Sequence, residues 1–138
     1  MMYLKEINYL AVLIAGIANM VVGFLWYGIF FGKAWLALVN KTEEELEKMR
    51  KSAPKAYIIN FLFSLVMAVV IVYIVHGMKL KGFLGGFLLG FFLWLGVAMV
   101  LRLNNVLFEK RPFKLFLINT GFDFCVLIVM GLILTLWK

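Results

Sequence analysis

The chain has 138 residues, of which 65% are hydrophobic and only 15% are charged, and its formal net charge is +7. A soluble domain this small has too little interior to bury so much apolar surface, so the composition excludes one. The positive charge could suggest binding to nucleic acid, but the Lys and Arg residues lie at the ends of apolar runs and between them. That placement is typical of membrane anchoring, and we expect no nucleic-acid partner.

Four apolar runs are long enough to cross a bilayer, whose core needs about 20 apolar residues per helix. They are residues 7–29, 57–75, 82–101 and 113–137. Together they occupy nearly the whole chain, which predicts a single integral membrane domain over residues 1–138. We expect an all-α membrane protein with four transmembrane helices, because a transmembrane barrel needs alternating apolar and polar positions that these continuous runs lack.

The connection after the first run is the longest. It begins with an aromatic-rich stretch, residues 30–35 (FFGKAW), whose aromatic rings and Lys suit the headgroup interface. Thr42 and Glu45 then form a capping-box pattern, with acidic residues in the first turns that follow and basic residues in the last. We expect a short cytoplasmic interfacial helix here, ending at Pro54.

The distribution of basic residues predicts the orientation. With four spans, both termini and the middle connection share one side, which holds four of the Lys and Arg residues, while the two longer connections hold ten. The positive-inside rule therefore places the two longer connections in the cytoplasm and both termini outside.

The second and fourth runs open with similar sequences. Lys55–Ser64 (KAYIINFLFS) matches Lys114–Asp123 (KLFLINTGFD), 59 positions later. A weaker echo links Phe24–Gly28 (FLWYG) and Phe92–Gly96 (FLWLG) in the first and third runs. Two matches in the same order predict an internal repeat of two tandem helical hairpins with a pseudo-two-fold axis along the membrane normal, since both copies enter from the same side. Chance similarity between biased membrane sequences is the alternative.

The third run carries a glycine zipper pattern, with Gly82, Gly86 and Gly90 spaced by four residues. Glycines at this spacing let two helix backbones approach closely. The partner is either the first run, which offers a small face at Gly16, Asn19 and Gly23, or the same helix of a second copy. The sequence thus leaves a homo-oligomer open.

We single out five polar residues inside the apolar runs as candidate site residues: Asn19, Asn60, Ser64, Asn119 and Asp123. Within each copy of the repeat the two polar residues are four apart and share a helix face. Ser64 and Asp123 lie about 13 Å beyond their anchoring lysines, near the bilayer centre. The asparagines suit interhelical hydrogen bonds.

Asp123 is the most informative of these residues, because an acidic side chain at this depth is costly unless it faces the bundle interior, a water pocket or a partner. It is a hydrogen-bonded structural group, a proton or cation site, or a contact between protomers. We expect no cation at its depth, because Arg102 lies near the cytoplasmic end of the third run and reaches down only partly. An unpaired carboxyl group there is expected to be protonated.

The remaining polar residues give weaker signals. Four of them form a cytoplasmic polar cluster that caps the interface or binds anionic lipid headgroups: Arg102, Asn105, Glu109 and Arg111. His76 and Cys125 lie at different depths, so they make neither a metal site nor a nucleophile–base pair. No motif indicates a cofactor or a catalytic residue.

Several short motifs along the chain carry a family resemblance: Leu25–Tyr27 followed by Phe31–Trp35, then Asn105–Pro112, Ile118–Gly121 and Met130–Gly131. As a set they resemble a family of small four-span prokaryotic membrane proteins catalogued as domain of unknown function 1761. The resemblance implies an integral membrane protein of about this size. It supplies no activity and no site residues.

Two functional classes follow. The first is a small carrier or channel for protons, ions or a small solute, which uses the five intramembrane polar residues. The second is a non-catalytic membrane module that binds lipid or a partner membrane protein. A water-filled pocket that reaches Asp123 favours the first class, and a dry interior with an exposed glycine face favours the second. An enzyme is the least favoured reading, because no acid–base pair shares a depth.

Overall fold

The structure is a computed structural model that describes residues 7–39, 41–110 and 112–137. These residues form helices and no strand. In chain order the elements are α1 (Tyr9–Gly23), a π-helical segment (Phe24–Phe30), α2 (Gly32–Val39), α3 (Glu43–Gly77), α4 (Gly82–Leu93), a second π-helical segment (Trp94–Ala98), α5 (Met99–Glu109) and α6 (Phe113–Leu136). Four continuous helices are long and apolar enough to cross a membrane, as expected: residues 9–30, 43–77, 82–109 and 113–136.

Local chemistry explains where the helices begin and end. The Asn8 side chain accepts a hydrogen bond from the Ala11 amide at 3.2 Å, and Thr42 Oγ1 accepts one from the Glu45 amide at 3.2 Å. Both are N-caps that satisfy an amide group left free at a helix start, and the second was predicted. Lys110 ends α5 in the left-handed conformation, with a φ of 55°.

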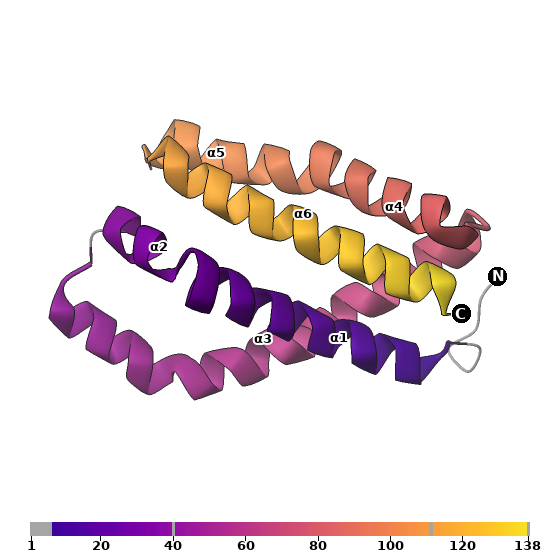
Figure 1. The fold of residues 1–138 in the computed structure, drawn as a ribbon, viewed down its shortest axis with the longest axis horizontal. Helices are drawn as coiled ribbons and strands as arrows, with labels where there is room; N and C mark the ends of the chain where they lie inside the picture. Colours follow the sequence, from indigo (N-terminus) through magenta and orange to yellow (C-terminus); the bar gives the residue numbers. More distant parts are fainter. Residues whose placement is uncertain (1–6, 40, 111, 138) are drawn as a thin grey trace.

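The predicted interfacial helix that ends at Pro54 is wrong in its end point. The helix that Thr42 caps continues through Pro54 to Gly77, so the segment is the N-terminal part of the 35-residue α3. Proline removes one backbone hydrogen bond inside a helix and commonly bends it. The residues around Pro54 are mostly exposed, so solvent can satisfy the freed carbonyl group. α3 changes direction in its N-terminal part (Figure 1).

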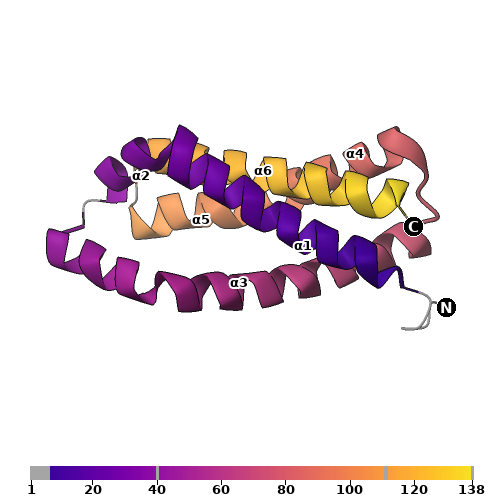
Figure 2. The same cartoon turned by 60° about the horizontal axis from the view of Figure 1, so that its bottom comes forward.

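The helices are arranged around α6, which packs against α1, α3, α4 and α5. α6 lies between α1 and the α4–α5 pair, and α3 crosses behind α1 (Figure 1) and lies along the lower side of the bundle in Figure 2. The start of α1, the end of α6 and the α3–α4 connection lie at one end of the bundle, and the α2–α3 and α5–α6 connections lie at the other (Figure 1). This up-and-down order fits four membrane crossings.

The core consists of small and medium side chains where α1, α3 and α6 meet. Ala15, Ala68, Val75 and Met130 are fully buried. Large side chains point outward instead, and Phe108 is 82% exposed. In a soluble protein such a surface would aggregate, whereas lipid is as apolar as the side chains that it covers.

The glycines of the third span contact α6. A Cβ atom on Gly90 would lie 2.6 Å from the Leu127 carbonyl oxygen, and one on Gly86 would lie 2.8 Å from the Gly131 carbonyl oxygen. The partner is therefore neither the first span nor a second copy, the two alternatives that the sequence left open. Gly82 does not take part: it begins α4 with a φ of +72°, and a Cβ atom there would meet nothing within 4 Å.

The orientation in the membrane remains a prediction that thiol labelling can check. In a Cys125→Ala background, Glu44→Cys places a thiol in the first turn of α3, and Lys79→Cys places one in the α3–α4 connection. We expect an impermeant reagent added to whole cells to label the Lys79→Cys variant alone, because the basic residues favour the cytoplasm for the other end. The opposite pattern would reverse the orientation. Asn40 and the outermost residues of both termini lie outside the described part of the chain.

Candidate functional site

Two of the predicted intramembrane polar residues join α1 to α3. The Asn19 side-chain amide donates a hydrogen bond to Ser64 Oγ, and Ser64 Oγ donates one to the Asn60 carbonyl oxygen at 2.8 Å. Asn19 and Ser64 are both buried. A buried and satisfied pair of this kind fixes the helices against each other, which is the structural role expected of membrane asparagines.

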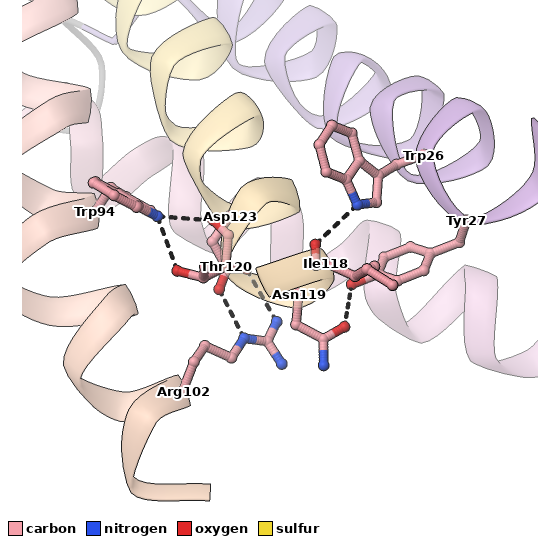
Figure 3. Close-up of polar contacts among 8 residues, drawn as sticks. All are labelled: Trp26, Tyr27, Trp94, Arg102, Ile118, Asn119, Thr120 and Asp123. Atoms are coloured by element: carbon pink, nitrogen blue, oxygen red, sulfur yellow. Dashed lines mark hydrogen bonds and ion pairs between the residues drawn. The ribbon is translucent and has the colours of Figure 1, made fainter. Parts of the chain in front are cut away.

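Asp123 on α6 is paired with Arg102 on α5. Arg102 Nε lies 2.7 Å from Asp123 Oδ2, and Arg102 Nη2 lies 3.0 Å from Asp123 Oδ1 (Figure 3). Two parallel hydrogen bonds between a guanidinium and a carboxylate are the strongest form of ion pair in proteins. The prediction that no cation lies at the depth of Asp123 is therefore wrong.

The error has a simple geometric cause. The third apolar run ends at residue 101, which puts Arg102 at the membrane boundary, but the helix continues through α5 to Glu109. Arg102 thus lies about two turns inside the helix, and at about 1.5 Å per residue it is only slightly shallower than Asp123. Because the guanidinium binds both carboxylate oxygens, the expectation of an unpaired acid is wrong.

Asn119, one helical turn before Asp123, has a different partner. Tyr27 in the first π-helical segment donates its hydroxyl hydrogen to Asn119 Oδ1 at 2.6 Å (Figure 3). The structure therefore places four of the five predicted residues in three separate side-chain contacts: Asn19 with Ser64, Asn119 with Tyr27, and Asp123 with Arg102. Asn60 is exposed, and its side chain makes only a 3.4 Å contact with the Met20 sulfur.

Two tryptophans hold α6 from opposite sides. Trp26 Nε1 donates to the Ile118 carbonyl oxygen at 2.9 Å, and Trp94 Nε1 donates to the carbonyl oxygen and the hydroxyl of Thr120 at 2.8 and 3.0 Å (Figure 3). Both tryptophans lie in π-helical segments, which are frequent at functional sites. Sequence reasoning missed this role, although both residues belong to the FLW echo between the first and third runs.

The tryptophan contacts can be tested by substitution. Trp26→Phe and Trp94→Phe keep an aromatic ring but remove the N–H donor, and each is expected to lower the stability by about 1 kcal/mol. Trp137→Phe is the control, because Trp137 is exposed at the end of α6. Thermal unfolding in detergent would measure the difference. Equal unfolding temperatures for all three variants would show that the two contacts to α6 contribute nothing.

A groove between α3 and α5 brings several polar residues together. Its volume is about 870 Å³, and its walls are mostly apolar side chains of α3, α6 and the third span. The polar residues that line it come from four helices: Asn19, Asn60, Arg102, Asn104, Asn105 and Asp123. We call this cavity the α3–α5 groove. Ser64 and Asn119 are not among its lining residues.

A second cavity lies toward the end of the bundle that holds the α5–α6 connection. Its volume is about 1100 Å³, and four basic residues line it: Lys33, Lys41, Arg102 and Lys110. We call it the basic pocket. Arg102 lines both cavities, whereas Asn119 and Tyr27 line only the basic pocket.

The predicted cytoplasmic polar cluster has three members in the described part of the chain. Arg102 pairs with Asp123, Asn105 lines the α3–α5 groove, and Glu109 ends α5. Arg111 lies outside the described residues. Within residues 7–39, 41–110 and 112–137, no group of three His, Cys, Asp or Glu side chains is placed to hold a metal ion.

Comparison with known proteins identifies a family and no activity. The family model described as a protein of unknown function (DUF1761) matches residues 10–135. This range covers the four apolar helices except the first residue of the first helix and the last residue of the fourth. This match confirms the resemblance seen in the short sequence motifs. No curated protein and no solved structure matches the chain.

Proposed function

The chain belongs to the DUF1761 family, and we propose from its geometry that it is a small membrane carrier whose solute binds in the α3–α5 groove. The main support for this proposal is the groove itself, because one cavity with mostly apolar walls is lined by Asn19, Asn60, Arg102 and Asp123. A volume of about 870 Å³ is within the usual range of small-molecule sites, as is a lining with few convergent polar groups.

The charge of the site narrows the class of solute. Arg102 neutralises Asp123, so a bare cation would have to displace the guanidinium from both carboxylate oxygens. A small polar or zwitterionic solute meets no such competition, because it can accept from Arg102 and donate to Asp123 or the asparagine side chains. We therefore favour such a solute over protons and inorganic ions. An ion pair within a membrane span is itself a common mark of a transport pathway.

The helix arrangement suits a carrier that moves as two parts. α3 packs along α1, and α4 packs along α6, while the groove separates α3 from α5. We propose that these pairs are the two tandem hairpins of an internal repeat, and that rocking of one against the other alternates access to the groove. The FLW echo supports this view, because both copies carry a π-helical segment.

Filling the groove tests the proposal. Ala98 lines the groove, whereas Val100, on the same span, is 46% exposed and does not line it. A panel of zwitterionic amino acids, polyols and small amides should contain compounds that raise the unfolding temperature of the parent protein in detergent. We expect Ala98→Phe to abolish that shift and Val100→Phe to keep it. A panel without effect on the folded parent would refute the solute site.

A further inference from the structure

We propose that the basic pocket binds the phosphate headgroup of an anionic phospholipid. The pocket is distinct from the proposed solute site, although Arg102 borders both cavities. Its position, its charge and its walls each point to this ligand.

The position of the pocket matches the headgroup region. Its lining residues come mainly from the first π-helical segment, α2, the α2–α3 connection and the α5–α6 connection, and α1, α3, α5 and α6 add a few more. Those two connections lie at the same end of the bundle (Figure 1). Tyr27, Trp35 and Tyr57 line the pocket, and tyrosine and tryptophan concentrate where the hydrocarbon core meets the headgroups.

The charge of the pocket is positive and uncompensated. Asp123 neutralises Arg102, but no ion pair joins Lys33, Lys41 or Lys110 to an acidic side chain in the described part of the chain. Among the described residues, the Lys41 side chain contacts the Met49 sulfur at 3.4 Å, and this contact leaves the charge of Lys41 unpaired. No acidic residue is among those that line the pocket. Three lysines around one cavity therefore attract an anion.

The walls select an amphiphile rather than a fully water-soluble anion. Phe24, Leu36, Val39 and Leu115 give the pocket an apolar lining beside the lysines. At about 1100 Å³ the pocket is much larger than a phosphate group, so it has room for the glycerol unit and the first part of the acyl chains. A phospholipid whose headgroup carries net negative charge fits both the charge and the walls.

Native mass spectrometry of the intact protein released from detergent tests this proposal. Phosphatidylglycerol and phosphatidylcholine with identical acyl chains are the probes. We expect the parent to retain phosphatidylglycerol about tenfold better, and we expect Lys33→Gln with Lys110→Gln to remove that preference. Lys55→Gln with Lys114→Gln is the matched control, because these lysines begin the repeat at the same end of the bundle but do not line the pocket.

Each arm of the experiment has a decisive outcome. An unchanged preference in the pocket variant, or an equal loss in the control variant, would overturn the proposal in favour of diffuse attraction. Glycerol 3-phosphate tests the alternative that the pocket binds a soluble organic phosphate instead of a lipid. If it raises the unfolding temperature of the parent as much as phosphatidylglycerol does, the ligand is a soluble organic phosphate and the lipid assignment is wrong. All four lysines are exposed, so both double variants should fold, and none of these outcomes depends on the solute groove.

Discussion

Gly90→Ala is expected to destabilise the bundle by about 2 kcal/mol, although it adds only a methyl group. The new carbon atom would lie 2.6 Å from the Leu127 carbonyl oxygen and 2.9 Å from the Ile128 Cα atom. Both are backbone atoms of α6, so no side-chain rotation can relieve the contact. α4 must move away from α6 along its length, and the close van der Waals packing between the two helices is lost.

The chain supplies a matched control for this prediction. Gly96 lies on the same span, and a Cβ atom there would meet nothing within 4 Å. Gly96→Ala should therefore leave the unfolding temperature in detergent nearly unchanged. If the two alanine variants unfold at the same temperature, α4 and α6 are not in backbone contact at Gly90.

Gly131 on α6 belongs to the same backbone contact between α4 and α6, although the sequence pattern does not include it. It lies outside the four-residue stripe of the third span, so the sequence predicts a smaller effect of substitution there. In the structure a Cβ atom on Gly131 would lie 2.7 Å from the Gly86 carbonyl oxygen. That prediction is therefore revised, and we expect Gly131→Ala to cost as much as Gly86→Ala.

Replacing one member of the Arg102–Asp123 pair should cost more than replacing both. Asp123→Asn or Arg102→Gln alone leaves one charge inside the bundle without its partner. The loss for a fully buried pair is about 3–5 kcal/mol, and we expect about 2 kcal/mol here, because the Arg102 side chain is 36% exposed. The double variant removes both charges and keeps two amides that can bond to each other. It should recover to within about 1 kcal/mol of the parent.

Unfolding of the four proteins in detergent, at one pH and one salt concentration, gives the comparison. Lys114→Gln is a suitable control for the loss of an exposed charge. A double variant no more stable than the weaker single variant would show that the charges are not coupled. An Asp123 that were only hydrogen-bonded, without an ionic partner, would instead tolerate Asn with little loss of stability.

The sequence predicts the helices well because the bilayer imposes a simple rule. Apolar runs of about 20 residues must become helices to satisfy their backbone groups, and all four do. Helix ends follow less simple rules. Two turns that mix polar and apolar residues, Arg102–Glu109, extend the third helix beyond its apolar run. Pro54 does not end α3. Hydropathy predicts the part of a helix that contacts lipid, whereas the helix itself can continue into the headgroup interface and beyond it.

Sequence reasoning selected some of the residues that line the α3–α5 groove, but not their partners. The sequence match between residues 55–64 and 114–123 selected Asn60, Ser64, Asn119 and Asp123. Their partners depend on helix packing, which spacing within one helix does not determine. The Arg102 pairing required the true length of α5. The roles of Trp26 and Trp94 required knowing that both indoles face α6. The FLW echo was the available sequence signal for these two tryptophans. It identified their positions in the first and third runs but not the direction in which their side chains point.

Uptake into proteoliposomes tests most directly the claim that the Arg102–Asp123 pair belongs to a solute site. The compound should be one that raises the unfolding temperature of the parent, and the comparison is with the Arg102→Gln, Asp123→Asn double variant, reconstituted at equal density and shown to be folded. We expect the parent to accumulate the compound and the double variant to lose at least about tenfold of the initial rate, or about 1.4 kcal/mol of barrier. Uptake by the folded double variant at the parent rate would contradict the account.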